Sequence, residues 1–377
     1  MSWRRIWAIA RKELVHITRD LRSLIMAVAV PFLMLLLFGY ALSLDVDEIP
    51  ALVFDLDRTP QSRELVEEFT ASRYFRIPFV AERQQQIEAE IDRGRIFLGI
   101  VIPEDYSEQL LTGGTAQIQL LIDGSDSNTA SIAVSYADGV VQRVRERWLE
   151  ESFRRKVGAE FRSAVEPRLR VWYNNELKSK NYIVPGLIAV ILMIISALLT
   201  SLTIAREWEM GSMEQILSTP LRPQELVLGK MAAFFVVGVT DAAVAIGAGV
   251  LIFEVPFRGS WLLLFATTFL FLFGALCWGI LLSAIARSQT LAFQMGIISS
   301  FLPAFLLSGF VFGIENMPRV VQVITYIVSA RYFVTILKGI FLKGVGIEIL
   351  FGEIVFLLLY STLVFVAATR KVGSRLA

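Results

Sequence analysis

The sequence has very few of the side chains that cross-link a protein or bind a transition metal. Its 377 residues include one cysteine and one histidine. Cys277 has no partner for an intrachain disulfide, and because it lies in an apolar run it does not indicate the redox compartment. His16 alone leaves little room for a histidine-based metal or catalytic site. These absences exclude a disulfide-stapled secreted scaffold.

Charged residues are also scarce. They make up 19% of the sequence, and 36 Lys and Arg nearly balance 35 Asp and Glu, for a net charge of +1. Such a chain has no overall attraction for nucleic acid, and we predict no nucleic-acid partner. Hydrophobic residues make up 55%, with 27 Phe, and the mean hydropathy is +0.60. Soluble domains average roughly 45–50% apolar and 25% charged residues, so the composition predicts a membrane protein.

Long apolar runs predict where the chain crosses the bilayer. A helix needs about 20 mostly apolar residues to span a hydrocarbon core of about 30 Å. Five runs reach that length with one charge at most: Ser23–Leu44, Asn181–Ala205, Met231–Phe253, Gly259–Ala286 and Ser288–Ile314. A sixth, Ile354–Thr369, reaches it if the helix starts near Ile347, whereas Val320–Ala330 is too short and fits an interfacial or re-entrant helix. We therefore predict a polytopic α-helical membrane protein with six transmembrane helices.

Basic residues at both ends predict the orientation of the chain. Lys and Arg concentrate on the cytoplasmic side of membrane proteins. Residues 1–22 carry six of them, and the tail, residues 370–377, carries Arg370, Lys371 and Arg375. Six crossings place both termini on one side, so we predict that both are cytoplasmic. Residues 45–180 then lie outside the cytoplasm, after an uncleaved anchor over residues 23–44.

The pattern over residues 45–180 predicts an extracytoplasmic α/β domain inserted between helices one and two. Four apolar segments are typical of strands, at 51–54, 76–80, 97–102 and 118–122. Polar helical stretches alternate with them, at 61–71, 82–92 and 103–111, and a longer one runs from about 129 to 169. Alternation of this kind indicates an α/β sheet. Pro103 is expected to open a helix that Gly113 closes. No nucleophile, base and oxyanion site are assembled here, so we expect a binding or docking module.

Residues Trp3–Asp20 predict an amphipathic helix. At about 100° per residue, one sector collects the apolar side chains, namely Trp3, Ile6, Trp7, Ala10, Leu14 and Ile17. The opposite arc collects Arg4, Arg5, Arg11, Lys12, His16 and Arg19. This separation is typical of a helix that lies in the inner leaflet with its basic side chains among lipid headgroups. The alternative is a simple topology anchor, for which basic charge alone would suffice.

The loop Arg206–Lys230 is acidic where a cytoplasmic loop is expected to be basic. Glu207, Glu209 and Glu214 outnumber Arg206 in its first half. An acidic surface is unsuited to anionic lipid, so we predict that it faces a protein. Met210, Met213 and Leu217 follow helical spacing, and Thr219-Pro220 ends the helix because the residue before proline avoids α geometry. An ordinary helical hairpin connection is the alternative.

This loop resembles the coupling segment of the permease subunit of a type-2 ABC exporter. The family pattern is matched at Glu207, Gly211, Ser212, Glu214, Gln215, Leu217, Thr219, Pro220, Glu225, Gly229 and Lys230. A second match to the same family falls after the fifth predicted crossing, at Ser308, Gly309, Phe310, Met317, Pro318, Arg331, Tyr332, Phe333 and Gly339. Gly313 and Ser329 stand where the family often has proline. The six-helix layout with its large insertion resembles the multidrug-exporter branch, and the resemblance covers essentially the whole chain.

The resemblance implies a division of labour between subunits. The sequence has no G-x-x-x-x-G-K-[ST] phosphate loop, so ATP and Mg would be bound by a separate ABC ATPase subunit, and this chain would be neither an enzyme nor the holder of a cofactor. Residues 206–219 would be the coupling helix, acting through Arg206, Glu207, Glu209, Gly211, Met213, Glu214, Gln215, Leu217, Thr219 and Pro220. The N-terminal helix would add a second contact through Trp3, Trp7, Arg11, Lys12 and Arg19.

The resemblance also implies an assembly and a location. A second permease, identical or paralogous, would complete the pathway in the inner membrane of a bacterium, with residues 45–180 in the periplasm. A periplasmic adaptor would hand cargo onward. The outer re-entrant segment, residues 315–337, would contribute Met317, Pro318, Arg331, Tyr332 and Phe333.

Polar residues within the predicted spans suggest a substrate path. Asp241 lies near the middle of the third crossing, where a charge costs roughly 2.5–3.5 kcal/mol on insertion scales. It would bind a cationic drug or an ion, or be protonated and hydrogen-bonded to Thr240 or a neighbouring helix. Gln294 and Phe305 are further candidates for this path, although helix packing and lipid contact are the commoner uses of such residues.

Three classes of function are compatible with these features. The first is an efflux permease driven by a partner ATPase. The second is an ion-coupled secondary transporter in which Asp241 carries the proton, although the sequence lacks the internal repeat that such folds usually contain. The third is a receptor or scaffold that senses a ligand through the outer domain. The sequence does not select a substrate.

Overall fold

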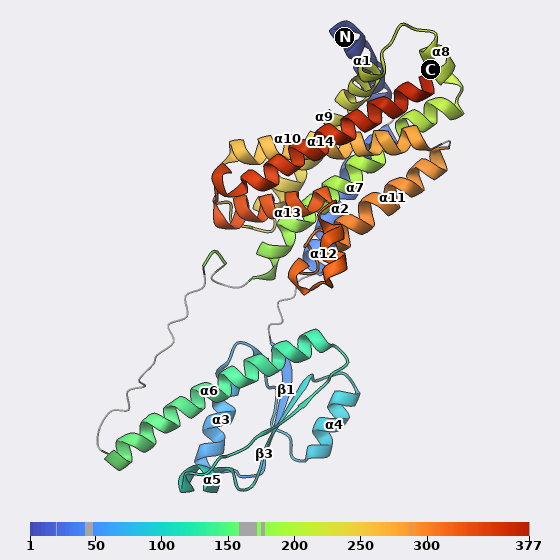
Figure 1. Cartoon of the computed structure of the whole chain (residues 1–377). Coiled ribbons are helices and arrows are strands. Elements are labelled where there is room, and N and C mark those ends of the chain that lie inside the picture. The colour runs from blue at the N-terminus through green and yellow to red at the C-terminus, as the bar shows by residue number, and fades with distance from the viewer. Residues whose placement is uncertain (20, 42–47, 158–171, 175–177, 287, 377) are drawn as a thin grey trace. The chain divides into compact units, whose positions relative to one another are not determined.

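The computed structural model describes residues 1–19, 21–41, 48–157, 172–174, 178–286 and 288–376 (Figure 1). The chain forms two compact units, which we describe separately. Met1–Ser43 and Arg170–Ala377 make a helical unit, and Leu44–Leu169 make an α/β unit.

The helical unit contains the candidate membrane spans. Five helices are long and apolar enough to cross a membrane: α7 (Ser179–Glu209), α9 (Pro223–Leu251), α10 (Trp261–Ile285), α11 (Gln289–Leu306) and α14 (Ile347–Leu376). A further helix, α2 (Leu21–Ala41), has 21 residues, which at about 1.5 Å each is enough for one crossing. The prediction of a polytopic helical protein is confirmed: the described residues contain five candidate spans, or six if the bent pair Arg319–Thr325 and Ser329–Lys343 is one span, and α2 comes in addition by its length. The fifth predicted span was too long, because α11 ends at Leu306 and turns replace helix before residue 314.

Helix α7 forms the centre of this unit and packs against α2, α9, α10, α11 and α13. Its contact with α10 is very close. A Cβ atom on Gly279 would lie 2.0 Å from Oγ1 of Thr200 and 2.3 Å from the carbonyl oxygen of Ala197. The Ser283 hydroxyl accepts hydrogen bonds from the amides of Ile204 and Ala205, each at 2.9 Å. Small residues and interhelical hydrogen bonds are the usual means of packing helices in a membrane, where lipid competes for apolar contact.

Between α11 and α14 the chain makes a bent helical segment. It contains the 3₁₀ turn Ile314–Asn316, α12 (Arg319–Thr325), α13 (Ser329–Lys338) and a π-helical turn, Gly339–Lys343. Helices α12 and α13 meet at 84°. The Gly309 carbonyl accepts from the Tyr182 hydroxyl near the start of α7, and the Phe341 carbonyl accepts from the Arg258 amide before α10. The segment therefore begins and ends at one end of the unit, as a re-entrant segment does.

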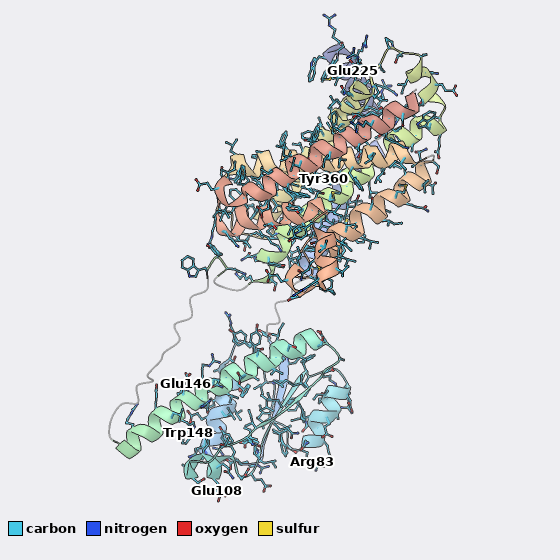
Figure 2. The ribbon with its side chains drawn as sticks, in the orientation of Figure 1. Arg83, Glu108, Glu146, Trp148, Glu225 and Tyr360 are labelled. Atoms are coloured by element: carbon cyan, nitrogen blue, oxygen red, sulfur yellow. The ribbon has the colours of Figure 1, made fainter. Side chains whose placement is uncertain are left out.

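Both chain termini lie at the other end, which we call the terminal end (Figure 1). Helix α1 (Trp3–Arg19) begins beside α9, because the Ser2 amide donates to Oε1 of Glu225 at 2.6 Å. Figure 2 shows Glu225 at this end. Near the C-terminus, a Cβ on Gly373 would lie 3.3 Å from Pro223. An even number of crossings requires this arrangement of termini.

The α/β unit is built on a four-stranded sheet. Its strands are β1 (Ile49–Asp55), β2 (Phe75–Arg76), β3 (Leu98–Ile102) and β4 (Gln119–Ile122), in the order β2-β1-β3-β4. Strands β2 and β3 are parallel to β1, and β4 is antiparallel to β3. The two central strands are almost wholly buried, which explains their continuous apolar sequences.

Four helices connect and cover these strands: α3 (Pro60–Ala71), α4 (Gln84–Asp92), α5 (Tyr106–Thr112) and α6 (Ser127–Val157). Helices α3 and α6 pack together beside a core that includes Val53, Phe69 and Ala133. On the opposite face, Ile87 of α4 packs with Leu52. The sheet therefore lies between two helical layers.

Several predicted boundaries in the α/β unit were wrong. The strand predicted at 76–80 is only the two-residue β2, followed by an isolated bridge at Val80. Helix α5 starts at Tyr106 and not at Pro103, because a turn intervenes; Gly113 ends it in the left-handed conformation, with φ of 81°. Helix α6 is described as far as Val157, and the rest of the long helix predicted to residue 169 lies outside the described residues.

Candidate coupling site

The segment between α7 and α9 forms an exposed elbow at the terminal end, which we define as residues 206–222. It is not the single helix predicted over residues 206–219. Helix α7 continues to Glu209, the chain turns at Met210 and Gly211, and α8 (Ser212–Leu217) begins. Gly211 has φ of 71°, a left-handed conformation that glycine adopts without the steric penalty of a side chain. The turn therefore breaks the helical pattern on which the prediction relied.

The elbow presents a mixed acidic and apolar surface to solvent. Met210 is 73% exposed, whereas Met213 is 1% exposed, so the two do not share one face as the predicted helix required. The other exposed members of the predicted coupling set are Glu209, Gly211, Glu214, Gln215, Thr219 and Pro220. The side chain of Leu217 lies outside the described residues. The exposed group surrounds the tip of the elbow, where another protein could contact it.

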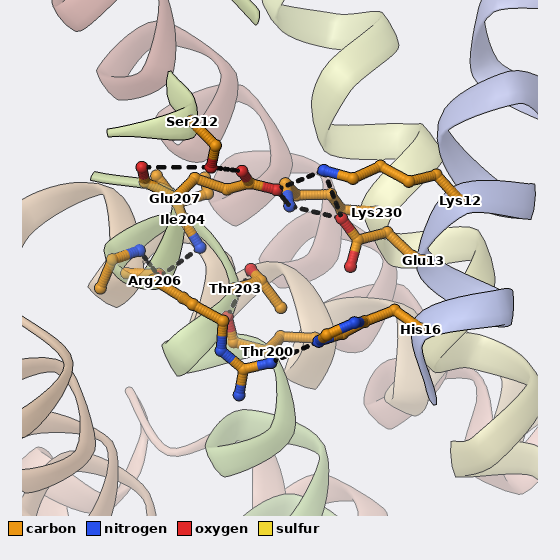
Figure 3. Close-up of polar contacts among 12 residues, drawn as sticks. Lys12, Glu13, His16, Thr200, Thr203, Ile204, Arg206, Glu207, Ser212 and Lys230 are labelled. Atoms are coloured by element: carbon orange, nitrogen blue, oxygen red, sulfur yellow. Dashed lines mark hydrogen bonds and ion pairs between the residues drawn. The ribbon is translucent and has the colours of Figure 1, made fainter. Parts of the chain in front are cut away.

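Glu207 points in the opposite direction, into the protein (Figure 3). The sequence predicted that this acid would face a partner. Instead its Oε1 accepts from Nζ of Lys12 at 2.7 Å and from Nζ of Lys230 at 3.1 Å, and its other carboxylate oxygen accepts from the Ser212 hydroxyl. The same Lys230 ammonium donates to Oε1 of Glu13 at 2.7 Å. We call Lys12, Glu13, Glu207 and Lys230 the ion cluster.

The ion cluster is balanced in charge and largely buried. Its two carboxylates and two ammonium groups sum to zero. The Lys230 side chain is 1% exposed, and those of Glu13 and Glu207 are 8% and 10% exposed, while Lys12 reaches solvent. A buried ion pair contributes little net stability when complete, but loss of one member leaves an uncompensated charge and is strongly destabilising. The cluster therefore holds α1, α7 and α9 in one arrangement.

Helix α1 packs on α9, so it is more than an isolated surface anchor. Ile6, Ala10 and Glu13 are buried, and a Cβ on Gly229 would lie 2.7 Å from Cβ of Ile9. Only one edge of the predicted apolar sector therefore contacts α9. The other edge is exposed, and Trp3 on it is 75% exposed. The remaining predicted interfacial residues, Trp7, Arg11, Lys12 and Arg19, are exposed.

Further contacts tie the elbow to α1 and α11. The Arg5 guanidinium donates to the Pro220 carbonyl and lies 3.5 Å from Oε2 of Glu225. Glu209 accepts from the Gln289 amide at 2.8 Å, at the start of α11. Arg206 lies 3.0 Å from the His16 ring and 3.4 Å from the Gln289 side chain. A force applied to the elbow would reach three other helices directly.

The residues predicted for a substrate path do not form one site. Asp241 on α9 is 2% exposed, and neither carboxylate oxygen has a hydrogen-bond partner among the described residues. Gln294 is exposed on α11. Phe305 packs with aromatic rings of Phe38, Phe301 and Phe310. No hydrogen bond or ring contact in the described part of the chain joins the three predicted residues.

The predicted outer residues lie in the bent segment. Met317 and Pro318 form the junction between the 3₁₀ turn and α12. The Arg331 guanidinium lies 4.1 Å from the centre of the Tyr326 ring. Tyr332 stacks on Phe356 and Phe333 on Phe271, with ring centres 3.7 Å and 4.1 Å apart. These residues pack the segment against α14 and α10.

Sequence reasoning missed Glu13, His16 and Gln289 as site residues. Glu13 carried a usable signal, because it is an acid next to the apolar sector of a helix whose other face is basic. Within the described residues, no group of three or more His, Cys, Asp or Glu side chains is placed to hold a metal ion.

Comparison with known proteins identifies the family. The model of the ABC-2 family transporter proteins matches residues 21–370. The chain belongs to this family. As an ABC-2 permease it is a multi-pass membrane protein and not an enzyme itself.

Relatives in Escherichia coli K12 match along nearly their whole length. This ABC-2 permease is 36% identical to the "Probable multidrug ABC transporter permease YbhS" over 370 residues, which cover 98% of this chain and 96% of the relative. It is 32% identical to the "Probable multidrug ABC transporter permease YbhR" over 350 residues, 93% of each chain. It is 26% identical to the "Inner membrane transport permease YhhJ", covering 89% of this chain and 90% of that one.

Proposed function

We propose that this chain is the membrane-spanning permease of an ATP-driven exporter for drugs or other xenobiotics. Membership of the ABC-2 family and the names of the two multidrug relatives support the cargo class. The observation that carries the proposal is the elbow: an exposed tip that is rigidly tied to α1, α9 and α11. A permease moved by a separate motor needs a surface for the motor and a stiff connection from that surface to its helices.

The elbow tip is the proposed seat of the ATPase subunit. Met210 and Glu214 are exposed there, and the ion cluster behind them prevents the tip from moving independently of α1 and α9. ATP and Mg are bound by the ATPase, since this chain has no phosphate-loop motif. Closure of the ATPase would push the elbow, and α7 and α9 would transmit the push to the pathway.

The wider assembly follows from the same proposal. A second permease, identical or paralogous, completes the pathway, and a periplasmic adaptor receives the cargo. Both termini and the elbow lie at one end of the helical unit, which is the cytoplasmic end in the bacterial inner membrane. The α/β unit is then periplasmic. Lipids contact the exposed edge of α1.

The test is retention of the ATPase by elbow variants. The wild-type complex is extracted from native membranes, and its subunits are identified by native mass spectrometry. Glu214→Arg and Met210→Asp change exposed side chains only, and each is expected to release the ATPase and abolish drug efflux. Lys371→Glu, an exposed charge reversal on α14 at the same end, is the matched control and should retain both.

Glu207→Arg is unsuitable for this test, because it would break the ion cluster inside the permease. Full ATPase retention and normal efflux in the Glu214→Arg, Met210→Asp double variant would refute the coupling assignment.

One observation favours a second candidate, an ion-coupled transporter. Asp241 is buried without a hydrogen-bond partner among the described residues, as expected of a group that binds a proton or cation in transit. Transport by the purified chain in vesicles with an ion gradient and no ATPase would support this candidate over the first.

A further inference from the structure

A large cavity lies at the terminal end between α1, α2, α7, α9 and α11. Its volume is about 590 Å³, within the range of roughly 300–1,000 Å³ that small-molecule sites occupy. Most of its lining is apolar and comes from four helices, including Val30, Ile195, Leu198, Phe234, Val237 and Phe293. The cavity can therefore hold an apolar body of drug or acyl-chain size.

One part of the cavity is lined by charged and polar groups from α1 and α7. Lys12, Glu13, His16, Arg206 and Glu207 contribute to it. The two carboxylates are already neutralised by Lys12 and Lys230 in the ion cluster. Their charges therefore leave no net negative potential to attract a cationic ligand.

Arg206 is the unbalanced charge in this lining. Among the described residues, its guanidinium contacts the His16 ring, at 3.0 Å, and the Gln289 side-chain oxygen, at 3.4 Å. No carboxylate among the described residues lies within ion-pair distance of it. Figure 3 places Arg206 and His16 together, apart from the ion cluster and between α1 and α7. A half-buried guanidinium without a carboxylate is well suited to bind an anion through paired N–H groups.

We propose that this cavity binds an anionic amphiphile, with a phosphate-type headgroup on Arg206 and His16 and its apolar body along α7 and α9. A phospholipid of the adjoining leaflet and a free anionic amphiphile share this chemistry. The proposal depends on the cavity and its charges and not on the ATPase, so its failure would leave the elbow assignment intact.

Direct binding to the purified full-length permease in neutral detergent tests the proposal, with dodecyl phosphate as the probe. We expect saturable binding of one molecule per chain by calorimetry. Arg206→Gln should weaken it at least tenfold, because it removes the one cation in the described lining that has no carboxylate partner there. Dodecyltrimethylammonium, with the same chain and the opposite charge, should neither bind the site nor compete. Arg370→Gln, an exposed change on α14 outside the cavity, is the control and should bind as wild type does.

Two further variants keep the test decisive if Arg206→Gln does not fold. His16→Asp changes an exposed side chain and places a carboxylate within reach of Arg206, so it should also weaken binding at least tenfold. Val237→Trp fills the apolar part without changing charge and should block binding of dodecyl phosphate. Equal affinity of wild type, His16→Asp and Val237→Trp, or equal binding of the cationic probe, would overturn the proposal.

Lipid analysis of the purified proteins identifies the natural source. Anionic phospholipid that co-purifies with wild type and is lost in His16→Asp assigns the cavity to a membrane lipid. If vesicles of phosphatidylglycerol do not displace bound dodecyl phosphate, the cavity is assigned to a free amphiphile. Either result supports the anionic site.

Discussion

Replacement of Lys230 by methionine should destabilise the permease sharply. Methionine keeps the length and apolar stem of lysine but removes the ammonium that Glu13 and Glu207 share, at 2.7 Å and 3.1 Å. The two carboxylates would then face each other across a buried space. Lys12 would remain near both, but its side chain is 59% exposed and cannot replace a buried charge fully.

The expected magnitude follows from the geometry. Because both carboxylate oxygens contact one ammonium, they lie at most about 6 Å apart, and at an effective dielectric constant of about 20 their repulsion is about 3 kcal/mol. Removal of one partner from a buried pair typically costs about 3–5 kcal/mol. We therefore expect a loss of about 3 kcal/mol, or roughly 6–12 °C in unfolding temperature for a unit of this size.

Thermal unfolding of the detergent-solubilised chain, followed by tryptophan fluorescence, measures this loss. The double variant Lys230→Met, Glu207→Gln restores charge balance with Glu13 and Lys12 and should recover most of the stability. Lys371→Met removes an exposed lysine from α14 and serves as the control.

Two outcomes would show that the ion cluster does not hold α1, α7 and α9 together. One is a Lys230→Met protein that unfolds at the wild-type temperature. The other is a double variant that is no more stable than Lys230→Met alone, because the loss would then come from packing and not from the unpaired carboxylates.

Three further predictions address other parts of the chain. Gly229→Leu should separate α1 from α9, because even a Cβ at this position would lie 2.7 Å from Ile9. Proteolysis of α1 should therefore become faster. Gly247→Leu is the control, since a Cβ at Gly247 would have no neighbour within 4 Å. Asp241→Asn should abolish resistance to cationic drugs while leaving the complex assembled; unchanged efflux would remove Asp241 from the path. Burial, and to a lesser extent nearby carboxylates, raises the pKa of Tyr106 from 10.0 to about 12. Between about pH 10 and 12 the native state therefore keeps a proton that the unfolded state loses. The stability of the α/β unit should fall as the pH rises through this range. Hydrogen exchange between about pH 10 and 12 measures this loss of stability, and the part caused by Tyr106 should be missing in Tyr106→Phe.

The spans could be predicted from the sequence because a run of about 20 apolar residues has few other uses. Their ends were harder to predict. The apolar run that contains α11 continues past Leu306 without a charge, but the chain bends after the helix, with Gly309 at φ of 79°. Hydropathy does not detect such a backbone conformation.

The orientation of Glu207 could not be predicted from the sequence alone. Helical periodicity assigns a residue to a face but does not say what packs on that face. Lys230 lies 23 residues from Glu207 and 217 residues from Glu13 along the chain. Only the tertiary structure brings the three together. The acidic loop was therefore interpreted as wholly outward-facing, although one of its three glutamates neutralises lysines within the permease.

The long sequence separation within the ion cluster has a consequence for biogenesis. Glu13 leaves the ribosome well before Lys230, which follows it by 217 residues. At about 5–20 residues per second, translation of that interval takes roughly 10–40 s. During this time α1 has no α9 to pack against, so Glu13 can join the ion cluster only after α9 has been synthesised.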